Sequence, residues 1–185
     1  MIHPDTEIQF ISEEIGYGVV AKKLIPRGTI TWVLDALDRI WTPKEIQAFP
    51  KEYHEIFDTY CFRNHNGDYI LCWDISRFVN HSFKSNCLTT AYDFEIAIRD
   101  IQPREQLTDD YGYLNIDSPF QAASEGTNRK IVYPDDLTRC HGLWDKQLAK
   151  AVVDSPSVAQ PLKYLVSASH WKEVNDAAKG VKPMK

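Results

Sequence analysis

Three short segments of the sequence carry side chains that could do chemistry. A Gly-Tyr-Gly run stands at residues 16–18, the segment FVNHSFKSNC at residues 78–87 places Asn80 beside His81, and DDYG follows at residues 109–112. An amide next to an imidazole can hold a ligand through its donor and acceptor atoms, bind a metal, or form a satisfied polar pair in a turn. Each segment taken alone leaves these alternatives open.

Other kinds of site are disfavoured by residue spacing. The glycines at 16–18 lie in strand-rich sequence and lack the third glycine and the following helix of a dinucleotide-binding loop. No spaced ligand motif such as HExxH is present, so a metal-dependent hydrolase is not expected. The cysteines Cys61, Cys72, Cys87 and Cys140 show no CxxC pairing and are typical of free thiols in a reducing compartment. We therefore expect an intracellular protein, cytoplasmic or nuclear.

The composition of the chain further limits the classes of protein to which it could belong. The chain has 185 residues, 43% of them hydrophobic and 12% aromatic, which is enough to build one domain with a core and an appendage. The formal net charge of −5 disfavours direct nucleic-acid binding and weakly favours basic peptides. No apolar stretch is long enough to span a membrane, and the first ten residues lack the apolar run of a signal peptide, so export would need a route without one.

The first two thirds of the chain predict short strands. Strands are expected at residues 19–21 and 29–34, and Asn66-Gly67 is a strong hairpin signal ahead of a strand at residues 69–73. Alternating hydrophobicity predicts two more strands on either side of Asp93. The sequence therefore favours many small strands joined by turns.

Helical patterns are concentrated near residue 42 and in the C-terminal third. Thr42, followed by Pro and Glu at the first and third helical positions, predicts a helix start, with an interruption at Pro50. Residues 115–140 are polar and irregular and predict a long loop, after which helices are expected at residues 143–153 and 161–180. The predicted fold class is β-rich α+β.

In chain order, the three motifs are more specific than any one of them. EEIGYGVVAKKLIPRGT, then ISRFVNHSFKSNC, then AIRDIQPREQLTDDYG resemble the SET-domain protein-lysine methyltransferases, over about residues 7–115. This resemblance implies a SET-domain fold of small curved β-sheets, with a pseudoknot that brings the NHS segment beside the DYG segment. It assigns residues 1–115 to the SET domain and residues 116–185 to a loop and helical extension that replaces a post-SET segment.

The resemblance implies a cofactor, S-adenosyl-L-methionine, and a set of residues that bind it. Tyr111 matches the tyrosine that lies near the reacting methyl group and is the predicted catalytic residue. The predicted cofactor-binding residues are Gly16, Tyr17, Gly18, Asn80, His81 and Tyr111. Glycines suit this role because no Cβ blocks a close approach to the backbone.

The same resemblance implies that a lysine side chain of a protein or peptide, a histone among the candidates, enters from the opposite face through an aromatic channel. Tyr60 and Phe62 are candidates for its walls, with plain core packing as the alternative. Asp109 stands where many relatives have Phe or Tyr near the channel. We hypothesise that its side chain points away, with Asp110 in a buried hydrogen-bond network.

Some positions depart from the family pattern. Cys87 and Cys140 are too few for the post-SET zinc site, so no metal is expected. Leu143 or Trp144 is expected to cover the adenine instead, with helix packing as the alternative for Trp144. Arg104 replaces a glycine of the family, so the shape of that turn is expected to differ. A SET-like binding module without catalysis remains the competing function.

Overall fold

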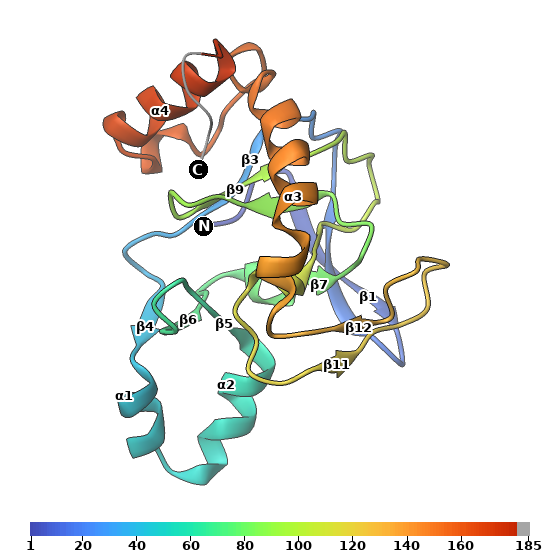
Figure 1. Ribbon diagram of the computed structural model, residues 1–185, viewed down its shortest axis with the longest axis vertical. Coiled ribbons are helices and arrows are strands. Elements are labelled where there is room, and N and C mark those ends of the chain that lie inside the picture. The colour runs from blue at the N-terminus through green and yellow to red at the C-terminus, as the bar shows by residue number, and fades with distance from the viewer. Residues whose placement is uncertain (181–185) are drawn as a thin grey trace.

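The computed structural model describes residues 1–180 and shows short strands surrounded by four α-helices (Figure 1). The strands are β1 (Thr6–Ser12), β2 (Gly16–Ala21), β3 (Ile30–Val33), β4 (Arg39–Trp41), β5 (Cys61–Arg63), β6 (Tyr69–Leu71), β7 (Asn80–His81), β8 (Cys87–Thr89), β9 (Phe94–Ala97), β10 (Thr108–Asp109), β11 (Phe120–Gln121) and β12 (Ile131–Val132). The helices are α1 (Pro43–Ala48), α2 (His54–Tyr60), α3 (Asp136–Val152) and α4 (Ala168–Ala178). The β-rich α+β class is confirmed.

Within residues 1–180 the strands form five separate sheets of two or three strands each. The three-stranded sheets have the orders β3-β9-β8 and β4-β6-β5, and both are antiparallel. The two-stranded sheets are β1-β2, β7-β10 and β11-β12. Because no sheet is large enough to cover a core by itself, the core must form between sheets.

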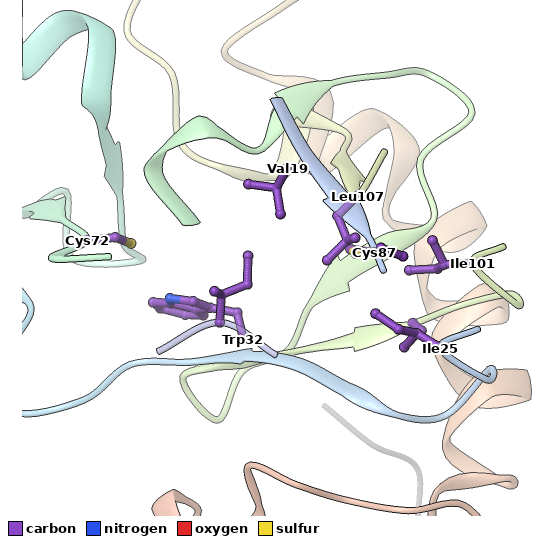
Figure 2. Close-up of a cluster of buried hydrophobic side chains, with 10 residues drawn as sticks. Val19, Ile25, Trp32, Cys72, Cys87, Ile101 and Leu107 are labelled. Carbon is purple, nitrogen blue, oxygen red and sulfur yellow. The ribbon is translucent and has the colours of Figure 1, made fainter. Parts of the chain in front are cut away.

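The main core cluster lies where the sheets and their connections meet (Figure 2). Val19 comes from β2, Trp32 from β3 and Cys87 from β8, and Ile101 and Leu107 come from the segment between β9 and β10. All five are buried. Residues that are distant in the sequence therefore share one core, which locks the motif-bearing segments together.

The C-terminal helices cover the β3-β9-β8 sheet (Figure 1). Trp144 and Leu148 of α3 pack with Leu88 and Ile96, whereas Val174 of α4 belongs to a cluster that includes residues of β3 and β9. None of the helices among residues 1–180 has the length and apolarity that crossing a membrane requires.

The helix at Thr42 begins as its sequence predicts. The Thr42 side chain accepts a hydrogen bond from the Glu45 backbone N–H, and the Glu45 carboxylate accepts one from the Thr42 backbone N–H, which completes a capping box. The helix stops before Pro50, and α2 follows after one 3-10 turn. Together α1 and α2 project from the β4-β6-β5 sheet at the bottom of the view in Figure 1.

The predicted loop at residues 115–140 is partly wrong, because it contains the β11-β12 hairpin and the first turn of α3. The hairpin pairs only two residues per strand, which is too short for alternation to show in the sequence. The helix predicted at residues 161–180 begins later, at Ala168, because Ser167 caps it. Residues 163–165 form a 3-10 turn instead.

The NHS and DYG segments meet as the resemblance implies. β7 and β10 pair in parallel, with Asn80 opposite Thr108 and His81 opposite Asp109. Arg104, in the turn before β10, has a φ of 71°, so an arginine occupies the left-handed conformation that glycine adopts most easily.

Candidate active site

Asn86 locks the two motif segments in register. Its amide Nδ2 donates to the Gln106 carbonyl oxygen at 2.7 Å, and its Oδ1 accepts from the Thr108 backbone N–H at 2.9 Å. The Ser82 backbone N–H donates to the Asp109 carbonyl oxygen at 2.8 Å. A two-residue pairing is weak alone, so this buried asparagine supplies much of what holds the segments together.

The glycine segment lies against Asn80. The Asn80 amide Nδ2 donates to the Tyr17 carbonyl oxygen at 3.0 Å and to Gln106 Oε1 at 3.1 Å. A Cβ on Gly18 would lie 2.5 Å from Gln106 Oε1 and 2.8 Å from Asn80 Nδ2, so any larger residue would push these side chains from their present positions. Gly16 has a φ of 79° and no atom within 4 Å of its Cβ position. We call residues 16–18 with Asn80 the glycine cradle.

His81 links the glycine cradle to Tyr111. The His81 Nδ1 accepts a hydrogen bond from the Tyr111 backbone N–H at 3.1 Å, so the neutral ring carries its proton on Nε2. Burial lowers the pKa of His81, which favours that neutral form. The ring packs against Phe83 and Phe120, and its buried Nε2 has no partner among residues 1–180.

Tyr111 is held by its own hydroxyl. The phenol donates to the Val79 carbonyl oxygen at 2.6 Å, and burial raises the pKa of Tyr111. Its ring contacts His81 on one side and lines a cavity on the other. A neutral phenol with this geometry can orient a neighbouring group but cannot act as a base near neutral pH.

The cavity beside Tyr111 has a volume of about 540 Å³. Tyr60 and Phe62, the two predicted wall residues, both line it. Further aromatic lining comes from Trp32, Phe57, Tyr69 and Phe120. This geometry suits an elongated side chain with a cationic end, because ring faces attract cations.

Asp109 corrects one expectation. Its side chain does not point away: it lines the cavity and is buried. Its Oδ1 accepts a hydrogen bond from the Tyr113 hydroxyl at 2.7 Å. A carboxylate oxygen of Glu95, which also lines the cavity, lies within 4.8 Å of the Asp109 carboxylate. Glu95 was not predicted as a site residue, because strand alternation places it opposite Phe94 and Ile96 and carries no sign of a cavity on that side.

Asp110 is buried in a network, as hypothesised. Its Oδ1 accepts from the Gly112 backbone N–H at 3.0 Å, and its carboxylate pairs with Arg129. Arg129 also pairs with Asp136 at 2.7 Å, and its guanidinium stacks over the Phe83 ring. Arg129 had no sequence signal because it lies in the segment predicted as a loop.

The β11-β12 hairpin is fastened to the NHS segment by Glu125. Its carboxylate accepts from the Phe83 backbone N–H at 2.9 Å, and its carbonyl oxygen accepts from Lys84 Nζ at 2.7 Å. The expectation for Trp144 is resolved in favour of helix packing, because its ring is 5% exposed and packs edge-on against Tyr113. Leu143 is exposed on the other side of α3.

The fold and this site together define a small β-rich protein in which His81 and Tyr111 connect a glycine cradle to an aromatic cavity. The family model for the SET domain matches residues 16–112, more than half of the chain. The chain therefore belongs to the SET-domain family.

A curated relative agrees with this assignment. The chain is 32% identical over 139 residues to a Schizosaccharomyces pombe protein described as "Histone-lysine N-methyltransferase, H3 lysine-9 specific". The match covers 65% of this chain and 28% of the relative's length, so the chain spans little more than a quarter of that protein.

Proposed function

We propose that this protein is a methyltransferase that transfers a methyl group from S-adenosyl-L-methionine to a lysine side chain of another protein. The observation that carries the proposal is the position of Tyr111. Its ring contacts His81, which adjoins the glycine cradle, and it also lines the aromatic cavity. A cofactor site and an acceptor site would therefore meet at one residue.

The residues present fit the cofactor. Gly16 leaves open space at its Cβ position, and the Tyr17 carbonyl and the Asn80 amide offer polar groups. The buried His81 Nε2–H has no acceptor within the described part of the chain, residues 1–180. S-adenosyl-L-methionine, when bound, supplies an electrophilic methyl group on a sulfonium. The glycine cradle would hold the amino-acid part, and His81 would lie beside the adenine.

The cavity fits the acceptor. The aromatic part of the wall can bind the alkyl stem of lysine, and burial disfavours the charged ammonium, whose free pKa is about 10.4. Tyr111 and the Val79 carbonyl oxygen would fix the direction from which the amine approaches. The protein's contribution would be alignment and desolvation.

Isothermal titration of S-adenosyl-L-methionine and of its demethylated product tests the cofactor site. Binding that is lost in Asn80→Ala and kept in the control Asn175→Ala, a change on α4, is the expected result. Absence of binding to the unmodified protein would overturn the proposal and leave the SET-like binding module.

The acceptor is found by incubating the protein with labelled cofactor and bulk histones, then with a cell lysate, and locating the methyl groups by mass spectrometry. Histones come first because the relative's description names histone H3 lysine 9. Methylation of lysine that is absent in Tyr111→Phe supports the proposed chemistry. Methylation confined to another residue type would contradict it.

A further inference from the structure

Two carboxyl groups lie together at the wall of the cavity, next to Tyr111. Glu95 comes from β9 and Asp109 from β10, and a carboxylate oxygen of one lies within 4.8 Å of a carboxylate oxygen of the other. Asp109 is 4% exposed and is further held by Tyr113, whereas Glu95 is partly exposed and also contacts Thr89 Oγ1 at 3.5 Å. Glu95 is therefore the member that a molecule in the cavity can reach. We call these two residues the carboxyl pair.

The carboxyl pair cannot carry two charges. Burial raises the pKa of Glu95 well above its usual range, and the charge of Asp109 raises it further. Burial also raises the pKa of Asp109. Two carboxyls in contact share one proton when the second ionisation is unfavourable, so the pair holds one proton and one negative charge near neutral pH.

The other ionisable groups around the carboxyl pair are neutral or distant. Cys87 Sγ lies within 4.8 Å of both carboxylates, and burial raises the pKa of this thiol well above its usual range, so it stays protonated. Tyr111 and Tyr113 are phenols whose pKa values burial raises. Arg63, Arg77, Asp58 and Asp117 line the same cavity, and Arg63 is paired with Asp117. The charges that raise the pKa of Tyr111 are those of Asp109 and Glu95, the carboxyl pair.

We propose that the carboxyl pair anchors the ammonium group of the acceptor lysine and then takes its proton. This inference rests on the proposed function. The N–H bond breaks, its electron pair stays on the lysine nitrogen, and the proton joins the carboxylate oxygen. The pair passes from one proton to two and from one negative charge to none, while the ammonium becomes a neutral amine able to attack. The second proton returns to solvent when the product leaves.

The pair answers a difficulty that one carboxylate would create. A fully ionised aspartate beside lysine stabilises the ammonium and opposes attack. A pair that shares a proton presents one negative charge instead of two to the ammonium, and burial favours the proton transfer because it leaves both the amine and the pair neutral. It also requires an N–H donor on the substrate, so it favours lysine that carries few methyl groups over dimethyl-lysine.

The first test measures whether an amine binds at the carboxyl pair, without any methyl transfer. Carboxyl carbon shifts of ¹³C-labelled Glu95 and Asp109 are followed by NMR during titration with n-butylamine hydrochloride, which mimics the lysine end, in buffer containing EDTA. Resonances that move in the unmodified protein and in Asp58→Asn, a change at a carboxyl that also lines the cavity, support the inference. Resonances that do not move would contradict it.

The second test separates this inference from the proposed function. Glu95→Gln and Asp109→Asn are expected to keep cofactor affinity within twofold, and to lower kcat for the methylated acceptor about 100-fold at pH 7.5, in the range of a lost general base. The kcat of both variants should recover as the pH rises toward 9.5, because the amine of the acceptor lysine then loses its proton to solvent. Unchanged kcat and pH profile in both folded variants would overturn the inference while leaving methyl transfer established. Loss of cofactor binding in the unmodified protein would overturn both.

Discussion

The glycine cradle and the aromatic cavity are linked through His81 and Tyr111 but are built in opposite ways. The cradle consists of backbone groups and one amide, and the side chains of Gln106 and Asn80 lie within 3 Å of where a Cβ on Gly18 would stand. The cavity consists of side chains from many elements, including two carboxyls whose pKa values burial raises. A cradle of backbone tolerates almost no change in residue type, whereas a wall of side chains can change its chemistry one residue at a time.

The largest effect is expected from adding one methyl group to the cradle. Gly18→Ala places a Cβ about 2.5 Å from Gln106 Oε1, so the side chains of Gln106 and Asn80 must shift and their hydrogen bond is disturbed. We expect cofactor affinity to fall at least 100-fold by titration calorimetry. Gly142→Ala, in α3 with no atom within 4 Å of its Cβ position, is the matched control and should raise stability by about 1 kcal/mol. Equal cofactor affinity in both variants would show that the cradle is not rigid.

A second change tests the network that backs the cradle. Arg129→Met leaves the buried carboxylates of Asp110 and Asp136 without their cation, so the free energy of unfolding should fall by about 3 kcal/mol in urea denaturation. The exposed Arg139, which also pairs with Asp136, serves as the comparison. Arg139→Met should cost less than about 1 kcal/mol. If the two variants lose a similar free energy of unfolding, the burial of the Arg129 ion pairs is not what makes them stabilising.

The cavity side is tested by pH. The pKa of Glu95 is raised in the folded protein, so the folded state binds a proton that the unfolded state releases above its ordinary pKa near 4.5. This contribution to stability is complete at acidic pH and is lost as the pH rises. The change in unfolding free energy caused by Glu95→Gln should therefore be more favourable at pH 8 than at pH 4, by about 1 kcal/mol. Thermal unfolding of both proteins at the two pH values measures it. A difference of opposite sign would mean that Glu95 is charged and well paired.

The smallest effect concerns the turn before β10. Arg104 has a positive φ, which costs most residues about 1 kcal/mol. Arg104→Gly should raise the unfolding free energy by about 0.5 kcal/mol, because glycine relieves strain but adds unfolded-state entropy. Gln102→Gly, at a nearby position whose φ is not positive, should instead lower the unfolding free energy. Destabilisation by both changes would show that the Arg104 side chain makes a contact that outweighs the strain.

These contrasts also explain how far the sequence predicts the molecule. The positions of Gly18, Asn80 and Tyr111 require particular residue types. The motifs around them therefore indicated the fold and the place where two segments meet. The position of Asp109 was predicted wrongly and Glu95 was missed, because a strand pattern specifies which side a residue faces and not whether that side borders water or a cavity. Arg129 was missed because its partners come from distant segments.

The pairing of β7 with β10 has a consequence for how the chain reaches its native state. The site exists only when Asn80 and His81 lie beside Thr108 and Asp109, and when β3 has already joined β9 across a long intervening stretch. Bringing distant residues together costs chain entropy before their contacts contribute any stabilising energy, so such topologies fold slowly. Cofactor affinity would therefore emerge late during refolding, and its appearance would mark the last long-range closure rather than the initial collapse.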